Sequence, residues 1–359
     1  MKRPGYFLLR TILGSVLGGA FILAGCKKTS DLVIPPPGPA WITFTETTTP
    51  QLLDDKINSL NADQSGRVWI GTDSGANYFQ RGTWGRIRDS LRYSPDGVQS
   101  RYKVNYIETG KGATIWFGLD GGGVKRFREG ATRAVWTTYN VPTITYYNVQ
   151  SISADKVVNG DVWVSTTFGI SRFIPSLNDP EFGTWLTYTA PTIPSNQVYA
   201  SAINFNDNTV WFGTQDGFAM YDDRVSDWTA FTLPTQYNYK INSMTFDRAG
   251  TLWMAKLVGV TSFNKELSEW KHYTNTNTGG KLPAGEIHAV TTDLGSVRWF
   301  GTDQGLVRLS DTTWTTFTTS TTPELPDNSV TALVYDSRGN LWIGTNKGIA
   351  IFNEEGTRF

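Results

Sequence analysis

The chain has 359 residues, 39% of them hydrophobic, so it can bury a large core and contains no long segment too polar to fold. Lys and Arg number 32 together, as do Asp and Glu, which argues against a nucleic-acid-binding protein, because such proteins need a basic face. We therefore expect no nucleic-acid partner.

Residues 1–25 have the pattern of a lipoprotein signal peptide. Lys2 and Arg3 give a basic start, an apolar run covers residues 11–24, and the tetrad ending at Cys26 reads Leu-Ala-Gly-Cys. The tetrad resembles the bacterial signal at which the chain is cut before the cysteine and the thiol is acylated. The apolar run is short for a spanning helix of about 20 residues. An ordinary signal peptide or an uncut anchor is the alternative interpretation.

Residues 26–40 are predicted to be a lipidated cysteine followed by a tether. Cys26 is the only cysteine, so no disulfide can form within the chain. The run Pro35–Pro37 favours an extended polyproline geometry that cannot enter the interior of a sheet. Acyl chains hold a protein stably on a membrane. We therefore expect a lipid-anchored protein of the bacterial cell envelope, at the outer membrane, with the side of that membrane left open.

Residues 41–359 contain a tandem repeat marked by tryptophan. Half of the 14 tryptophans lie in runs such as Val-Trp-Ile-Gly-Thr at 68–72, and half lie in Trp-x-x-aromatic runs such as 314–317. The first series, which recurs every 42 to 48 residues, is Trp69, Trp116, Trp163, Trp211, Trp253, Trp299 and Trp342. The second series is Trp41, Trp84, Trp136, Trp185, Trp228, Trp270 and Trp314. This periodicity indicates a repeat architecture and predicts that most of these rings lie in the core.

Each unit is predicted to hold four short strands. In the last unit, strands at 330–334, 341–345 and 349–352 are separated by turns at 336–339 and 346–348, and the Trp-x-x-aromatic run supplies the fourth strand elsewhere. The Asp-x-x-Gly sequence of the first turn suits a type I turn and lacks the further acidic ligands of a calcium loop. Four-stranded units with a fixed Trp and Gly predict an all-β, seven-bladed β-propeller.

The last unit lacks a fourth-strand tryptophan, and the missing strand is found at the other end of the repeat. The run Trp41–Phe44 precedes Ile57 by the same 16 residues that separate Trp314 from Val330. We predict that this N-terminal strand completes the last blade and closes the ring. Closure removes the open sheet edges that would otherwise pair with other chains.

The units resemble the two-component regulator propeller repeat, which runs Asp, Gly, Leu-Trp-Ile-Gly-Thr and then Gly-Leu or Gly-Ile. Trp69, Trp211, Trp299 and Trp342 lie in the best matches, and the resemblance covers about residues 41–359. It implies the periplasmic sensing part of a membrane sensor, often of the Bacteroidetes type and in several cases linked to glycan sensing. This sequence shows no kinase and no second membrane span, so we expect a stand-alone lipoprotein propeller that does not signal by itself.

Residues suited to catalysis or metal binding are scarce. The two histidines are His272 and His288, and neither lies near a nucleophile elbow. A single cysteine allows no Cys/His metal cluster. We therefore expect no catalytic residues, no metal and no cofactor. Some propellers with similar repeats are lyases, so such an enzyme is the alternative.

The innermost strands carry a polar residue after an opening apolar or small residue. The predicted polar ring around the central channel is Asn58, Asn105, Gln150, Ser201, Asn242, His288 and Thr331. Solvation of a water-filled channel explains such a ring, and a ligand site is the alternative interpretation.

One face of the propeller is predicted to collect loop residues suited to a ligand. The loops that lead into the innermost strands supply Lys56, Lys103, Tyr146, Tyr147, Tyr199, Tyr239 and Lys240. The turns between second and third strands supply Asp73, Asp120, Gln215, Asp303 and Asn346. Aromatic rings beside hydrogen-bonding groups suit a glycan or a protein partner. We expect non-catalytic binding there, with an assembly scaffold as a further alternative and the loops at 127–136 and 173–185 on the opposite face as a second location.

Overall fold

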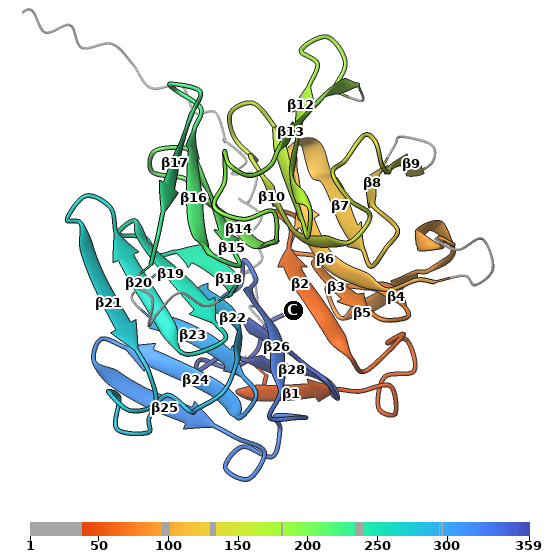
Figure 1. The fold of residues 1–359 in the computed structure, drawn as a ribbon. Helices are drawn as coiled ribbons and strands as arrows, with labels where there is room; N and C mark the ends of the chain where they lie inside the picture. Colours follow the sequence, from red (N-terminus) through yellow and green to blue (C-terminus); the bar gives the residue numbers. More distant parts are fainter. Residues whose placement is uncertain are drawn as a thin grey trace, which may run out of the picture. The chain divides into compact units, whose positions relative to one another are not determined.

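The computed structural model describes residues 38–94, 101–129, 134–180, 182–233, 240–293, 295 and 297–359. Within these residues the chain forms seven four-stranded antiparallel sheets arranged as the blades of a propeller (Figure 1). This confirms the predicted seven-bladed propeller. Cys26 and the predicted signal peptide lie outside the described residues. Across the described part of the chain, no helix is long and apolar enough to cross a membrane.

The blades follow one another along the chain, each from its innermost to its outermost strand. Blade 1 comprises β2 (Ile57–Ala62), β3 (Val68–Thr72), β4 (Gly75–Gln80) and β5 (Thr83–Ile87). Blade 2 comprises β6 (Val104–Thr109), β7 (Thr114–Leu119), β8 (Val124–Glu129) and β9 (Ala134–Tyr139). Blade 3 comprises β10 (Val149–Ala154), β11 (Val162–Thr166), β12 (Gly169–Pro175) and β13 (Gly183–Tyr188). Blade 4 comprises β14 (Val198–Asn204), β15 (Thr209–Thr214), β16 (Gly217–Asp222) and β17 (Asp227–Phe231).

The second half of the chain continues the same pattern. Blade 5 comprises β18 (Ile241–Phe246), β19 (Thr251–Lys256), β20 (Val260–Asn264) and β21 (Glu269–Tyr273). Blade 6 comprises β22 (Ile287–Thr292), β23 (Val297–Thr302), β24 (Gly305–Ser310) and β25 (Thr313–Phe317). Blade 7 comprises β26 (Val330–Tyr335), β27 (Leu341–Thr345), β28 (Gly348–Phe352) and β1 (Trp41–Phe44). Two short 3₁₀ turns are η1 (Asp89–Leu91) and η2 (Lys111–Ala113).

The N-terminal strand closes the ring as predicted. β1 pairs antiparallel with β28, with Trp41 opposite Phe352 and Phe44 opposite Ile349. The innermost strands pack neighbour to neighbour around the channel, and β26 of blade 7 packs against β2 of blade 1. The two ends of the propeller sequence therefore share one sheet.

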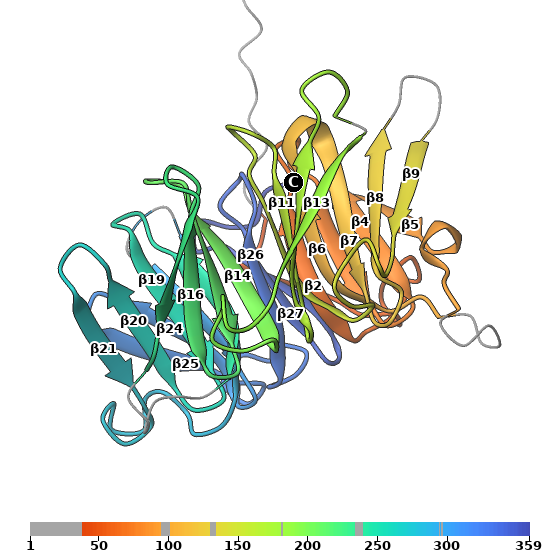
Figure 2. The ribbon, with the colours of Figure 1, turned by 45° about the horizontal axis from the view of Figure 1, so that its top comes forward.

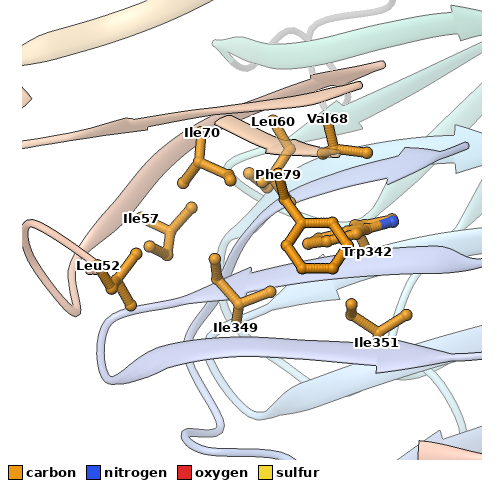
Figure 3. Packing of buried hydrophobic residues seen from close by; sticks show 10 residues of the cluster. Leu52, Ile57, Leu60, Val68, Ile70, Phe79, Trp342, Ile349 and Ile351 are labelled. Atoms are coloured by element: carbon orange, nitrogen blue, oxygen red, sulfur yellow. The ribbon is translucent and has the colours of Figure 1, made fainter. Parts of the chain in front are cut away.

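The core lies between adjacent blades, where the tryptophans of the second strands are buried. Between blades 7 and 1, the ring of Trp342 lies 5.2 Å from that of Phe79, with Ile57, Ile349 and Ile351 packed around them (Figure 3). The outer-strand tryptophans are half-buried. Each blade therefore buries its second-strand indole against the next blade, which confirms the core prediction and explains why the rings repeat with the blade.

The Asp-x-x-Gly segments are turns, as predicted, and they also anchor the buried indoles. Trp342 Nε1 donates to Asp336 Oδ2 at 3.0 Å, and the Asp336 main-chain carbonyl accepts from Gly339, whose φ is +79°. The same indole bond joins Trp69 to Asp63 at 3.0 Å. Among the described residues, no group of three or more His, Cys, Asp and Glu side chains is placed to hold a metal ion.

The propeller has two faces, which we name A and B. Face A is formed by the loops that lead into the innermost strands and by the turns joining second to third strands; face B is formed by the other turns. The chain enters the propeller on face B, where Gly38 N donates to Thr357 O at 2.9 Å and Asn353 N donates to Ala40 O at 2.9 Å. The turn between β12 and β13, also on face B, extends to the top of Figure 2.

Candidate functional site

A β-bulge recurs at the start of every innermost strand and sets the polar ring. In β2, Ile57 pairs with Thr72 and Ser59 with Gly71, so Asn58 is the extra residue. The same register shift occurs in the other six innermost strands and leaves one extra residue in each, namely Asn105, Gln150, Tyr199, Asn242, His288 and Thr331. A bulge re-aims the extra side chain, and here five of the seven line the mouth of the central channel.

Ser201 was wrongly predicted to belong to the ring. The innermost strand of blade 4 opens at Val198, so its bulge residue is Tyr199. Ser201 is buried instead, and its hydroxyl lies 2.8 Å from Ser153 Oγ. Ala200 resembles an opening residue in the sequence, and only the strand pairing shows that the strand starts two residues earlier.

The mouth of the channel on face A is a polar cavity of about 360 Å³. The residues that line it are Asn58, Lys103, Asn105, Asp120, Asn148, Gln150, His288 and Thr331. Asn105 Nδ2 and Gln150 Nε2 both reach Asn148 Oδ1, at 3.2 and 2.8 Å. Asn148 was not among the predicted residues, although its place directly before an innermost strand, like that of Lys56 and Lys103, could have indicated it.

Paired charges surround this cavity. Lys103 Nζ lies 3.2 Å from Asp120 Oδ2, and Lys56 Nζ lies 3.2 Å from Asp73 Oδ2. Burial alone would raise the pKa of Asp73, but hydrogen bonds from Asn58 and Lys56 hold that pKa below its ordinary value. The carboxylate is therefore ionised at neutral pH and its charge is balanced by its neighbour.

Two further acidic residues face this region from blade 6. His288 Nε2 lies 2.6 Å from Asp303 Oδ1. Glu286 Oε1 accepts from Asn242 Nδ2 at 2.8 Å and lies 3.9 Å from Lys240 Nζ. Glu286 was missed in the sequence, where it occupies in unit six the position that Lys240 occupies in unit five. Carboxylates, amides and an imidazole together offer acceptors and donors suited to the hydroxyl groups of a neutral, polar ligand.

An exposed aromatic cluster adjoins the mouth on blade 3. The ring of Tyr146 lies 4.6 Å from that of Phe168 and 6.1 Å from that of Tyr147, and the three residues are 38%, 56% and 43% exposed. Asn148, which lines the mouth, follows Tyr147 directly and forms a bridge with Asp120. Phe168 was not predicted; its signal is that no other unit carries an aromatic residue in this turn.

The remaining predicted residues that the structure describes lie around the rim of face A. Lys240 Nζ lies 4.6 Å above the ring of Tyr199, whose hydroxyl donates to Gln197. Gln215 and Asn346 use their backbone N–H groups to bind the carbonyls of Gln197 and Ser329, at 2.9 and 3.3 Å. These two residues join the turn between the second and third strands to the loop that leads into the innermost strand. Neither of them lines the mouth cavity. Tyr239 lies outside the described residues.

Comparison with known proteins identifies the repeat. Residues 51–74 and 324–347 match the family model described as two component regulator propeller, which confirms the predicted resemblance. Over 195 residues the chain is 25% identical to Histidine kinase P4 of Formosa agariphila, covering 53% of this chain and 13% of that protein. The chain thus spans only a small part of the curated relative.

Solved structures share the fold. The extracellular domain assigned to the hybrid two-component system BT3049 of B. thetaiotaomicron superposes with a TM-score of 0.72 at 19% identity, covering 88% of this chain and 41% of that one. Virginiamycin B lyase of Staphylococcus aureus superposes with a TM-score of 0.66 at 16% identity, covering 87% and 99%. The chain thus shares its propeller fold both with the extracellular domain of a two-component system and with a lyase.

Proposed function

We propose that the protein is an envelope lipoprotein whose propeller binds a glycan on face A without transforming it. The observation that carries this proposal is the exposed Tyr146–Phe168 pair beside a polar mouth. An aromatic face stacks on the apolar side of a sugar ring, while amides and carboxylates bind its hydroxyl groups. The fold of extracellular sensing domains and the lipoprotein signal ending at Cys26 both support an envelope location.

The test starts with a glycan-array screen of the propeller and titrates the best ligand against variants. Tyr146→Ala combined with Phe168→Ala should weaken binding at least tenfold, which corresponds to about 1.4 kcal/mol, and leave the melting temperature unchanged because the rings are exposed. The matched control is Leu257→Ala, which removes an exposed apolar side chain elsewhere on face A. A lower melting temperature with unaltered affinity would instead assign these rings to packing.

The His288–Asp303 pair favours one alternative, an enzyme of the lyase type. An imidazole held by a carboxylate can act as a general acid or base. The propeller is therefore incubated with virginiamycin B and with any glycan from the array, and the products are analysed by mass spectrometry. The binding proposal expects unchanged mass for both; a product that disappears in His288→Ala would establish the enzyme instead.

A further inference from the structure

Face B carries a second set of exposed side chains, which neither the repeat nor the candidate site explains. Leu177 is fully exposed, and Phe182 and Leu267 are each 70% exposed. The set, here called the apolar tips, comprises Val157, Leu177, Phe182, Phe205, Val225 and Leu267. All six lie in turns at this one face, and all belong to blades 3, 4 and 5. Single exposed apolar residues are ordinary, but six of them on one face of three consecutive blades are a candidate interaction surface.

The turns that carry the apolar tips are joined to one another by polar contacts. Arg172 of blade 3 binds Asp161 of its own blade and lies 2.6 Å from Asp223 Oδ1 of blade 4. Lys265 Nζ of blade 5 lies 3.5 Å from Asp207 Oδ2 of blade 4. The apolar tips therefore project from a connected layer in which these charges are already balanced, so the partner they fit is selected by apolar contact rather than by charge.

Several backbone N–H groups in these turns are bound by side chains of the same turn. Asp155 Oδ1 accepts from the N–H groups of Val157 and Val158, both at 2.9 Å. Asn264 Oδ1 accepts from Leu267 N at 3.0 Å. A turn whose N–H groups are bound internally can enter a lipid surface without leaving those groups without partners, which a bilayer penalises strongly.

The chain enters the propeller on the same face. Gly38 and Ala40 bind the C-terminal segment there, and Cys26 precedes Gly38 by 12 residues. A fully extended chain spans at most about 3.3–3.6 Å per residue, so the thiol can lie no more than about 43 Å from this point. This step rests on the proposed anchoring at Cys26: an acylated cysteine would hold face B near the membrane.

We propose that face B is a lipid-contact surface. The apolar tips of blades 3, 4 and 5 insert into the interfacial layer of the bilayer, across the ring from blade 7, where the tether joins. The propeller then rests on the membrane at two places, the tether and the apolar tips. Face A points away from the membrane, which leaves its mouth open to a ligand.

Vesicle binding by the propeller without its anchor tests the proposal. Residues 38–359 contain all seven described sheets and their inter-blade cores, so we expect this fragment to fold on its own, which its circular dichroism spectrum and thermal melt check first. Its partition onto phosphatidylcholine vesicles is measured by co-sedimentation, with and without added phosphatidylglycerol. Leu177→Ser combined with Phe182→Ser should lower the partition coefficient at least tenfold. Leu257→Ser combined with Val258→Ser, on face A, is the matched control and should change it little.

The proposal expects binding that is insensitive to salt and to the anionic lipid. It is overturned if the unmodified fragment does not bind vesicles, if both double variants lose binding equally, or if binding requires phosphatidylglycerol and is abolished by salt. Sedimentation velocity tests the alternative that a second copy of this chain binds the apolar tips. If the fragment self-associates but does not bind vesicles, and Leu177→Ser combined with Phe182→Ser abolishes the self-association, the apolar tips are assigned to a second copy. These results are independent of glycan binding on face A and of processing at Cys26, so either part of the proposed function can fail separately.

Discussion

Lys256 stands at a position that threonine holds in five of the seven blades, and it is buried there. In those five, the threonine hydroxyl at the end of the second strand donates to a glycine carbonyl three residues later, as Thr345 does to Gly348 at 2.8 Å. In blade 5 only the backbone bond from Lys256 N to Gly259 O, at 3.1 Å, continues this pattern. Burial lowers the pKa of the Lys256 ammonium from 10.5 to about 8.

This lowered pKa predicts a pH dependence of stability. Between pH 8 and 10.5 the unfolded chain holds a proton that the folded chain has lost, so the free energy of unfolding rises with pH in this window. The gain is on the order of 3 kcal/mol across the window. In Lys256→Thr this rise should disappear, and the variant should be more stable than the parent at pH 7. Urea melts at a series of pH values check this; parallel curves for the two proteins would contradict it.

For single residues, the sequence predicts which turn or strand a residue belongs to better than it predicts the contacts of its side chain. The spacing of Asp63 and Trp69 predicted a turn followed by a strand, but not the bond from the indole to the carboxylate, because that bond depends on how the turn folds back over the strand. The sequence likewise showed that the fifth unit departs at Lys256 without showing that its ammonium is buried. The burial and the bonding partners of a side chain depend on residues of neighbouring blades, which lie far away in sequence.

β1 is the element whose loss would open the ring. Its tryptophan lies 4.6 Å from the ring of Phe352 and 5.8 Å from that of Phe317, and among the described strands β28 has no other partner on that side. Deleting residues 41–44 should lower the free energy of unfolding by about 3 kcal/mol or more, because it removes a half-buried indole and exposes a sheet edge. Thermal melts measure the loss. A fragment beginning at residue 38 is the control and should melt like the full chain.

Strand number and closure were predictable because each blade carries its own tryptophan and the 16-residue spacing repeats. The bulge at the start of each innermost strand was not predictable, because an extra residue on one strand is defined by the pairing with its neighbour and not by the sequence of that strand. In the sequence the bulge residue could be recognised only as a polar residue that follows an apolar or small one. This criterion selected the wrong residue in blade 4, where Ala200 resembles the residue that opens the strand. Of the aromatic pair, Tyr146 was predicted and Phe168 was not, because the two rings come from different loops and only the fold brings them together.

For the molecule as a whole, the decisive variant is Cys26→Ser. If the Leu-Ala-Gly-Cys tetrad directs acylation, the variant should either keep its signal peptide, seen as an unprocessed mass, or be cut without acylation and leave the detergent phase in a Triton X-114 partition. Mass spectrometry of the mature protein gives the second readout. Unchanged mass and unchanged partition would show that the thiol carries no lipid. Lys28→Ala, a change within the predicted tether, should behave as the parent does.

The shared sheet of blade 7 has a consequence for the order in which the protein is made. Among the described strands, β1 is synthesised first and its partner β28 is synthesised last. Six blades can therefore assemble while both edges of β1 are unpaired, and blade 7 is completed only after β28 has been synthesised. A chain interrupted before Gly348 lacks β28 and cannot form this pairing. We expect such a chain to expose a sheet edge that is open to pairing with other chains, so a closed propeller requires all seven units to be synthesised.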